Sequence, residues 1–281
     1  MQLRIATCRP LPETDPDEEL LLAALRDRGI EARMAAWNDP VEPWGEPVPT
    51  VIRSTWDYYH DLERFLEWAR AAGSVAPLWN PFEVVRWNAH KGYLDELARS
   101  GHAVVPTLIF ARGSRASLGA IAREHGWTDV VVKPAVSAAS FGTRRFLPGD
   151  LREGETHLAA LLAEGDALVQ PYVDSVDDNG ERALVWIDGE FTHAVRKTPR
   201  FTGQEEQVSP AVPIEADELE LGRAVLAPWA AEILYARVDV ARDERGRPRV
   251  MELELIEPSL FLMQSEPALQ RLADGIRRRL R

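Results

Sequence analysis

Hydrophobic and polar positions in the first 88 residues follow strand and helix periods in alternation. The patterns, in order, are LRIAT (3–7), DEELLLAALRDRG (17–29), PTVIRS (49–54), DLERFLEWARAAG (61–73) and APLWNP (76–81). We expect Asp15 to cap the first helix, Pro16 to occupy its first position and Gly29 to end it. This order predicts an open α/β lobe over residues 1–88.

The next part of the chain alternates again, and strand patterns then dominate to the end. The expected elements are HKGYLDELARSG, VVPTLIF, GSRASLGAIAREHG, DVVVKP, TRRF, DLREGETHLAALLAEG, ALVQPYV, a hairpin over 181–197, an aperiodic and mobile loop over 199–215, a helix over 216–234 broken near Pro228, a hairpin over 238–256 and a helix over 265–280. Asp188-Gly189 is a strong turn signal in the first hairpin. We therefore predict an α/β protein with α+β lobes, divided into residues 1–88, 89–168 and 169–281.

Charge and cysteine content narrow the functional classes. The 281 residues carry a formal net charge of −12, with the basic residues dispersed among acids, which argues against a nucleic-acid-binding surface. Cys8 is the single cysteine, so an internal disulfide framework and a cysteine-based zinc site are excluded. No apolar run is long enough for a membrane span or a signal peptide, and we expect a soluble cytoplasmic protein that acts on a small substrate.

An acidic strand near the C-terminus is the first candidate site. Glu252 and Glu254 alternate with apolar residues in VMELEL, so the period of two places both carboxylates on one face. Taken alone, this pattern also fits a solvated face of an antiparallel sheet. Asp239 lies between two valines on the preceding strand, and a hairpin would bring it beside the glutamates. Three carboxylates would need a cation between them, and oxygen ligands favour Mg²⁺ or Mn²⁺.

The segment TDVVVKPAVSAASFGTRRF (128–146) is the second candidate. Lys133 ends a buried strand pattern, and an ammonium group there can lie over a phosphate. The small residues that follow, Ser137, Ala138, Ala139, Ser140 and Gly142, would let backbone N–H groups approach the same phosphate. The alternative is a lysine that extends to solvent before an ordinary turn. Neither a Walker motif nor a dinucleotide fingerprint is present.

The order of these features resembles the ATP-grasp superfamily over about residues 88–260. The features are Lys91, Lys133 with its small-residue loop, 168-LVQPYVD-174, Arg182, 196-RK-197, Asp239, Glu252 and Glu254. The chain is most similar to the branch of glutathione synthetase and the ribosomal-protein glutamate ligases. The stretches RSTWDYY, NPFEVVRWNAHKGYL and ELIEPSLF resemble the bacterial group that includes the D-cycloserine-forming ligase. The resemblance implies an ATP-grasp fold with an N-terminal pre-ATP-grasp domain over residues 1–88.

The resemblance also implies roles for individual residues. Lys91 and Lys133 would hold the phosphates of ATP beneath a flap over 137–142, and Gln170, Tyr172 and Val173 would form the hinge that binds adenine. Arg182, Arg196 and Lys197 would stabilise the transferred phosphoryl group or the substrate carboxylate, with Arg196 as the candidate for the oxyanion of the second step. Asp239, Glu252 and Glu254 would bind magnesium, with manganese as an alternative. Relatives commonly carry asparagine in place of Glu254 and more glycine in the flap, so this chain departs from the pattern at both places.

Candidate substrate contacts lie in and around RSTWDYY. Arg53, Trp56, Asp57 and Tyr58 follow a strand of the first lobe, where open α/β lobes bind ligands, and could contact an amino acid. The alternative is a capped turn with Trp56 filling a lobe interface. Glu257 is either a further substrate contact or an acid at a helix start.

These expectations together describe an ATP- and Mg²⁺-dependent carboxylate-amine ligase that forms an acyl phosphate on amino-acid-like substrates. Two other classes stay open from the sequence. One is a non-catalytic nucleotide-binding module, and the other is a metal-dependent hydrolase that uses Glu252 and Glu254 as paired carboxylates. The family suggests a homodimer, and we expect neither nucleic acid nor a membrane as a partner.

Overall fold

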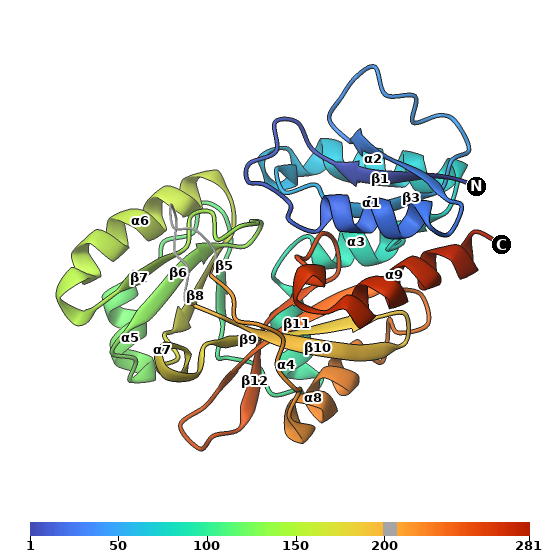
Figure 1. Cartoon of the computed structure of the whole chain (residues 1–281). Helices are drawn as coiled ribbons and strands as arrows, with labels where there is room; N and C mark the ends of the chain where they lie inside the picture. The colour runs from blue at the N-terminus through green and yellow to red at the C-terminus, as the bar shows by residue number, and fades with distance from the viewer. Residues whose placement is uncertain (199–206) are drawn as a thin grey trace.

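Three four-stranded sheets, each with its own helices, make up the described part of the chain (Figure 1). The structure is a computed structural model that describes residues 1–198 and 207–281, with the backbone alone for Asn179. The mobile loop predicted at 199–215 therefore lies partly outside the described residues. Its described part is tied to the neighbouring strand through bridges of Val208 to Lys197 and of Val212 to Ala194.

The N-terminal sheet is parallel, with the strand order β2-β1-β3-β4. Its strands are β1 (Gln2–Thr7), β2 (Glu31–Ala36), β3 (Thr50–Ser54) and β4 (Leu78–Trp79), and its helices are α1 (Glu18–Arg26), α2 (Leu62–Val75), α3 (Phe82–Asn88) and the short η1 (Tyr58–His60). Strand β2 and helix α3 were not predicted. Strand β2 lies at the sheet edge and is half exposed, so its sequence EARMAA lacks the apolar run of a buried strand.

The predicted start of helix α1 was wrong by two residues. The N-cap position is Asp17 rather than Asp15, and Pro16 lies before the helix. Asp15 instead accepts a hydrogen bond from the backbone N–H of Asp17 at 3.0 Å. The carboxylate of Asp17 accepts hydrogen bonds from the N–H groups of Leu262 and Met263, both at 3.1 Å. Asp17 therefore ties the N-terminal lobe to a segment near the C-terminus.

The central sheet has the order β5-β8-β6-β7 and is antiparallel. Its elements are β5 (Leu108–Phe110), α5 (Leu118–His125), β6 (Val130–Pro134), β7 (Arg144–Phe146), η2 (Pro148–Asp150), α6 (Leu151–Glu164) and β8 (Ala167–Pro171). Helix α4 (Tyr93–Arg99) precedes them and packs in the core of the C-terminal sheet, and α7 (Ser175–Asn179) follows them and contacts β9 and β11. Helices α5 and α6 cover one face, where Val130 and Val132 of β6 join the core. The opposite face of β6 carries Val131 and Lys133, because side chains alternate along a strand.

The C-terminal sheet is antiparallel, with the order β10-β9-β11-β12. Its elements are β9 (Glu181–Ile187), β10 (Glu190–Lys197), α8 (Ala216–Leu226), β11 (Tyr235–Arg242), β12 (Pro248–Glu254), η3 (Leu262–Gln264) and α9 (Glu266–Arg279). The turn at Asp188-Gly189 has positive φ at both residues, as predicted for this hairpin. Strand β11 begins three residues before the predicted 238, and α8 ends two residues before Pro228.

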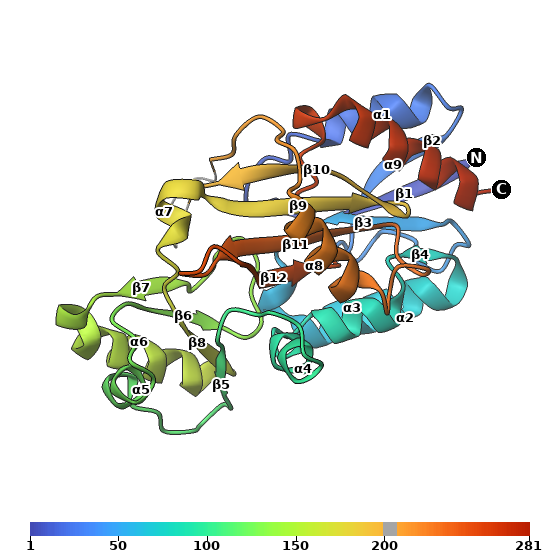
Figure 2. The same cartoon turned by 90° about the horizontal axis from the view of Figure 1, so that it is seen from below.

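One core joins the N-terminal lobe to the C-terminal sheet. Leu3 and Ile5 of β1 pack in the same cluster as Val185 of β9 and Leu272 of α9. Helix α9 runs beside α1, so the last helix of the chain closes over the first (Figure 2). The division of the chain at residues 88 and 168 stays a prediction.

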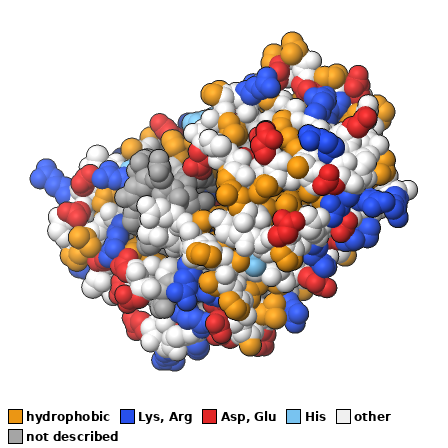
Figure 3. Space-filling view, in the orientation of Figure 1, with side chains coloured by type: hydrophobic (Ala, Val, Ile, Leu, Met, Phe, Trp, Pro, Cys, Tyr) orange, Lys and Arg blue, Asp and Glu red, His pale blue; other side chains and the backbone are white. Residues whose placement is uncertain are grey.

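Charged side chains of both signs are mixed over the face drawn in Figure 3. Such mixing agrees with an acidic chain whose basic residues are dispersed. In the described ranges, none of the helices has the length and apolar character that a membrane span requires.

Candidate active site

A cavity lies where the three lobes meet, and it gathers most of the predicted residues. The sequence contains three lysines, Lys91, Lys133 and Lys197, and all three line this cavity. The other basic residues of the chain are arginines, which predominate on the surface. A lysine presents a compact charge on a flexible stem, which suits contact with single phosphate oxygens. The placement of all three lysines around one cavity makes this cavity the candidate functional site.

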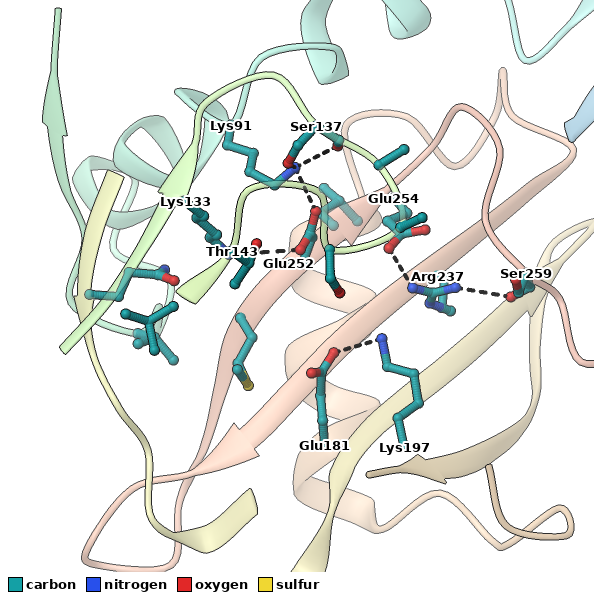
Figure 4. A pocket seen from close by; sticks show the side chains of 18 of the residues that line it. Lys91, Lys133, Ser137, Thr143, Glu181, Lys197, Arg237, Glu252, Glu254 and Ser259 are labelled. Carbon is teal, nitrogen blue, oxygen red and sulfur yellow. Dashed lines mark hydrogen bonds and ion pairs between the residues drawn. The ribbon is translucent and has the colours of Figure 1, made fainter. Parts of the chain in front are cut away.

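Lys91 and Lys133 approach the same carboxylate (Figure 4). Lys91 lies in the turn before α4, and its Nζ is 3.0 Å from Oε1 of Glu252. The same ammonium group donates to the carbonyl oxygen of Ser137 at 2.9 Å and to its Oγ at 3.1 Å. Nζ of Lys133 is 3.8 Å from Oε2 of Glu252. Burial lowers the pKa of Lys133, although the charge of Glu252 opposes this effect.

The predicted flap connects β6 to β7 and contributes Ser137, Ala138, Ala139, Ser140 and Thr143 to the cavity wall. Ala139 and Ser140 have φ of 49° and 58°, in the left-handed region that favours glycine. Glycine adopts such φ values without steric strain, so a flap with more glycine would be less strained at these two positions.

Two contacts fix the ends of the flap. The backbone N–H of Lys91 donates to the carbonyl of Ala135 at 2.8 Å. Gly142 lies outside the cavity wall, and a Cβ on it would approach Cγ of Pro134 to 2.8 Å. Its φ of +70° and this close approach both require glycine. Gly142 therefore shapes the flap and is not among the residues that line the cavity.

The flap also contacts the N-terminal lobe. The ring of Phe141 lies 4.7 Å from that of Tyr59 and 5.6 Å from that of His60, measured between centroids. Phe141 is 44% exposed, so the contact covers only part of the ring. The flap thus rests on RSTWDYYH through a small aromatic cluster rather than through a buried interface.

The predicted adenine hinge forms one wall of the cavity. Gln170, Tyr172 and Val173 all line it, next to Val131 and Val105. The side chain of Gln170 donates to Oγ1 of Thr107 at 2.8 Å, and the backbone N–H of Tyr172 donates to the carbonyl of Asp129 at 2.9 Å. Apolar walls with a few fixed polar groups are typical of a site for a planar base.

The side chains of the acidic strand β12 alternate between its two faces as predicted, except at one irregular position. Asp239 pairs in register with Glu252, whereas Val240 pairs with Val250, so Met251 is the extra residue of a β-bulge. Met251 and Glu252 consequently both line the cavity, although they are consecutive. Burial by itself would raise the pKa of Glu252, but the ammonium groups of Lys91 and Lys133 lower it to about 2.

Arg237 lies at the centre of the remaining charges and was missed in the sequence. Its guanidinium donates to both oxygens of Asp239 at 2.8 and 2.9 Å, to the carboxylate of Glu254, and to the carbonyl of Ser259 at 3.3 Å. The sequence could have indicated Arg237 as a site residue, because Arg237 and Asp239 are two residues apart on one strand and therefore share a face. Burial raises the pKa of Glu254 to about 7, although Arg237 opposes this shift.

Lys197 binds two acids on the same face of the sheet. Its Nζ lies 2.6 Å from Oδ2 of Asp239 and 2.8 Å from Oε1 of Glu181. Burial would raise the pKa of Asp239, but the charges of Arg237 and Lys197 hold it well below its usual range. Glu181, which was also missed, has its pKa raised to about 7 by burial, against the effect of Lys197.

The predicted magnesium ligands have suitable donors but do not meet at one point. Over residues 1–198 and 207–281, no three His, Cys, Asp or Glu side chains converge as a metal site. Glu252 and Glu254 line the cavity, whereas Asp239 lies behind Lys197 and Arg237 and is fully buried. The positive charges that lie between these carboxylates are those of the Lys197 and Arg237 side chains. An oxygen-only donor set still fits Mg²⁺ by its chemistry.

The two predicted arginines of the first hairpin lie on the other face of the sheet. Arg182 and Arg196 are register partners, and both therefore point away from Lys197 and Glu181. Nε of Arg182 lies 2.8 Å from Oε1 of the fully buried Glu218 on α8, and Arg196 is exposed. Neither lines the cavity. His193, on the same hairpin, is buried beside Phe261.

The predicted substrate contacts divide into two groups. Trp56, Tyr58 and Glu257 line the cavity, together with Glu13 and Ser259. Arg53 does not line it and is buried to 1% exposure. Asp57 faces the lobe interior, where it accepts hydrogen bonds from Nε1 of Trp37 at 2.6 Å and Nδ2 of Asn38 at 2.7 Å. Asp57 therefore holds the turn through Trp37 and Asn38, and its side chain does not cap η1, as the alternative interpretation of a capped turn would require.

The chain is similar to known proteins over nearly its whole length. A family model described as "D-cycloserine synthetase DcsG, N-terminal domain" matches residues 3–80. The cycloserine biosynthesis protein DcsG of Streptomyces lavendulae is 32% identical over 95% of each chain. A crystal structure of D-cycloserine synthetase DcsG covers 100% of both chains with a TM-score of 0.91 and 32% identity. A RimK domain ATP-grasp protein from Sphaerobacter thermophilus covers 98% of this chain and 99% of its own, with a TM-score of 0.71 and 18% identity.

Proposed function

The chain belongs to the D-cycloserine synthetase group of ATP-grasp ligases, and from this premise we propose that it joins a carboxylate to an amine through an acyl phosphate formed on a small amino-acid-like substrate. As a member of this group, it is an ATP-dependent ligase that forms C–N bonds, with an α/β ATP-grasp fold. Membership excludes the two classes that the sequence left open, a non-catalytic module and a hydrolase. What we propose beyond this membership is the acyl-phosphate intermediate, the substrate class and the residues that act in each step.

One observation carries the proposal. The three lysines of the chain and the carboxylate of Glu252 meet around one cavity, with the hinge on one side and residues of the N-terminal lobe on the other. ATP would lie with its base against Gln170, Tyr172 and Val173 and with its phosphates near Lys91 and Lys133. The flap over 137–142 would cover the phosphates and exclude water.

In the first step, a carboxylate oxygen of the substrate attacks the γ-phosphorus. The bond from phosphorus to the β,γ-bridging oxygen breaks, ADP leaves with that electron pair, and an acyl phosphate forms. Lys91 and Lys133 hold the phosphoryl oxygens in line and offset their charge. Mg²⁺, or Mn²⁺ as the alternative, would be held by Glu252 and Glu254 with Asp239 behind them, and it supplies further charge neutralisation at the phosphates.

In the second step, the amine nitrogen attacks the carbonyl carbon of the acyl phosphate. The carbon–oxygen bond to phosphate breaks, phosphate departs with the electron pair, and the proton that the nitrogen loses goes to the departing phosphate. We assign stabilisation of the tetrahedral oxyanion to Arg237 instead of Arg196, because Arg237 lines the cavity and is held rigidly by Asp239 and Glu254. Lys197 would contact the phosphoryl group from the floor of the cavity.

The relatives support the substrate class. The most similar relatives described above are named for D-cycloserine, an amino-acid derivative. The test is a screen of amino acids and their amide- or ring-forming derivatives with ATP and Mg²⁺, read by phosphate release and mass spectrometry. An active substrate is then labelled with ¹⁸O in its carboxylate. Transfer of one ¹⁸O atom to the released phosphate is expected, and label that stays wholly in the organic product would overturn the acyl-phosphate step.

A further inference from the structure

Two strands of the central sheet bring Thr107 beside Gln170. Strand β5 pairs with β8 so that Leu108 lies opposite Val169, and Thr107 and Gln170 are the next residues on the two strands. Val169 points into the core beneath α5 and α6, so the side chain of Gln170 leaves β8 on the opposite face. That face belongs to the cavity wall, since Gln170 and its register partner on β6, Val131, both line the cavity.

A chain of two hydrogen bonds fixes the orientation of the Gln170 amide. The hydroxyl of Thr107 donates its single proton to the carbonyl oxygen of Val105 at 2.8 Å. Toward Gln170 it can therefore only accept, and Nε2 of Gln170 donates to it at 2.8 Å. Reversal of the amide would place Oε1 against the lone pairs of Thr107 or would cost Thr107 its bond to Val105. The amide thus keeps Nε2 at Thr107, which itself does not line the cavity.

The other branch of this amide, Oε1 of Gln170, is a hydrogen-bond acceptor. Within residues 1–198 and 207–281, no side chain or backbone group donates to it, and Gln170 is 4% exposed. An exocyclic amino group, such as the 6-amino group of adenine, would donate to this oxygen. A 6-oxo group, as in hypoxanthine or guanine, would bring a second acceptor against it, and two acceptors repel each other.

The hinge that follows Gln170 is held as firmly as the amide. The backbone N–H of Tyr172 donates to the carbonyl of Asp129 at 2.9 Å, and the guanidinium of Arg145 lies over the ring of Tyr172, 3.4 Å from its centroid. A base that enters the cavity therefore meets an acceptor that is fixed before binding. A fixed acceptor discriminates between bases because it cannot rotate to suit the wrong one.

We propose that Thr107 is a positioning residue that sets the nucleobase specificity of the enzyme. By fixing the amide of Gln170, it makes the cavity select a base with a 6-amino group over a base with a 6-oxo group. The inference rests on the proposed function, which places the base of ATP against Gln170, Tyr172 and Val173. Without the hydroxyl of Thr107, the amide could turn and present Nε2 to a 6-oxo base, so the two kinds of base would bind more alike.

The experiment compares Mg²⁺-ADP with Mg²⁺-IDP, its 6-oxo analogue, by isothermal titration. The wild type should bind ADP about tenfold or more tightly than IDP. Hypoxanthine also differs from adenine at N1, so the variants decide the role of Thr107. Thr107→Val keeps the branched shape without the hydroxyl and should lower the ADP-to-IDP ratio by about fivefold, as for one neutral hydrogen bond. Thr107→Ser restores a hydroxyl and should keep the ratio.

The same substitution on the outer surface of α6, Thr156→Val, is the matched control and should also keep the ratio. Gln170→Glu supplies a second background, because both oxygens of a carboxylate accept and no orientation has to be chosen. In that background, Thr107→Val should leave the ratio unchanged. Thr107→Ala, which also lacks the hydroxyl, takes the place of Thr107→Val if the valine variant does not fold.

Two results would show that Thr107 supports the fold alone and would overturn the inference. One is equal weakening of ADP and IDP by loss of the hydroxyl, which leaves the ratio at its wild-type value. The other is the same fall in the ratio with glutamine and with glutamate at position 170. A wild-type ratio near one, with both nucleotides bound, would also overturn the inference and leave the proposed function in place. Failure of the wild type to bind either nucleotide would overturn the proposed function, and the inference with it.

Discussion

The ammonium nitrogen of Lys91 lies 3.0 Å from Oε1 of Glu252, and this contact joins the turn before α4 to strand β12 at the cavity. Lys133 approaches the other oxygen of the same carboxylate at 3.8 Å. A triphosphate that enters between the lobes carries more negative charge than Glu252 does. We therefore expect it to attract both ammonium groups and to leave Glu252 available to Mg²⁺.

The first prediction concerns this ion-pair cluster. Lys133→Ala and Glu252→Gln should each lower ATP turnover by about 100-fold or more, because phosphoryl transfer depends on positioning and charge neutralisation. Thermal unfolding should show that both variants fold. Arg245→Ala and Glu244→Gln, on the exposed turn between β11 and β12, are the charge-matched controls and should keep wild-type turnover. Wild-type turnover in both cavity variants would remove the site assignment.

The second prediction separates three arginines. Arg237→Lys should reduce product formation by about 100-fold or more while the Kd for ATP changes little, as for the loss of an oxyanion donor. Arg196→Ala should retain activity, because its side chain is exposed and lies on the other face of β10. Single-turnover kinetics with ATP titrations would measure both quantities. A large loss in Arg196→Ala with a small one in Arg237→Lys would return the role to Arg196.

Arg182→Ala should act on stability rather than on chemistry. The substitution removes the partner of the fully buried Glu218, and breaking a buried pair costs about 3 kcal/mol. Urea denaturation would measure the loss in the free energy of unfolding. The residual contact of Glu218 with Arg242 at 3.2 Å should limit it. Near-normal turnover per folded molecule is expected, and a specific loss of turnover would contradict the placement of Arg182.

The third prediction uses the lysine content of the chain. An amine-reactive reagent can modify only the N-terminus and the three cavity lysines, because the sequence contains no others. Mg²⁺ with ATP should protect Lys91, Lys133 and Lys197 together and leave the N-terminus reactive. Peptide mass spectrometry with and without nucleotide would measure this. Equal labelling of the lysines in both samples would show that nucleotide does not bind in the cavity.

Strand parity explains which part of the site could be predicted. The alternation in VMELEL predicted that Glu252 and Glu254 lie on one side of the strand, and both line the cavity. The same rule, applied to 181–197, puts Arg182 and Arg196 on one face and Glu181 and Lys197 on the other. The roles of Arg182 and Arg196 were assigned from the family resemblance. The alternation along β9 and β10 argues against those roles, because it places both side chains on the face away from Lys197.

The features of the site that could not be predicted from the sequence depend on contacts between residues far apart in the chain. The bulge at Met251 depends on the pairing of β11 with β12, and the hydrogen bonds of Arg53 and Trp56 reach residues about 200 positions later. Asp17 likewise binds N–H groups of the segment before α9. Local periodicity carries no information on such contacts. The expected homodimer and the cytoplasmic location stay predictions.

The fourth prediction concerns the flap. Phe141→Ala removes the ring that contacts Tyr59 and His60, so the closed flap should be less populated. We expect more ATP hydrolysed per amide bond formed, since water reaches the acyl phosphate more often. Parallel assays of phosphate release and product would give the ratio, with Leu147→Ala, another exposed apolar residue after β7, as the control. An unchanged ratio would show that this contact does not help closure.

The last prediction concerns pH and stability, through a histidine outside the cavity. His193 is buried, and burial lowers its pKa from 6.5 to about 4, although the backbone of Phe261 opposes the shift. Between these values the unfolded chain binds a proton at this residue and the folded chain does not. The contribution of His193 to the free energy of unfolding is therefore full above pH 6.5 and is lost as the pH falls toward 4, by up to about 3 kcal/mol.

His193→Gln tests this assignment, because glutamine keeps a polar side chain but has no proton to bind in that range. Carboxylates also titrate between pH 4 and 6.5, so the wild type and the variant must be compared at each pH. Urea denaturation should give the variant a shallower fall in the free energy of unfolding over this interval, with a constant difference between the two proteins above pH 6.5. Parallel curves through the whole interval would show that His193 titrates alike in the folded and unfolded chains, which its burial beside Phe261 argues against.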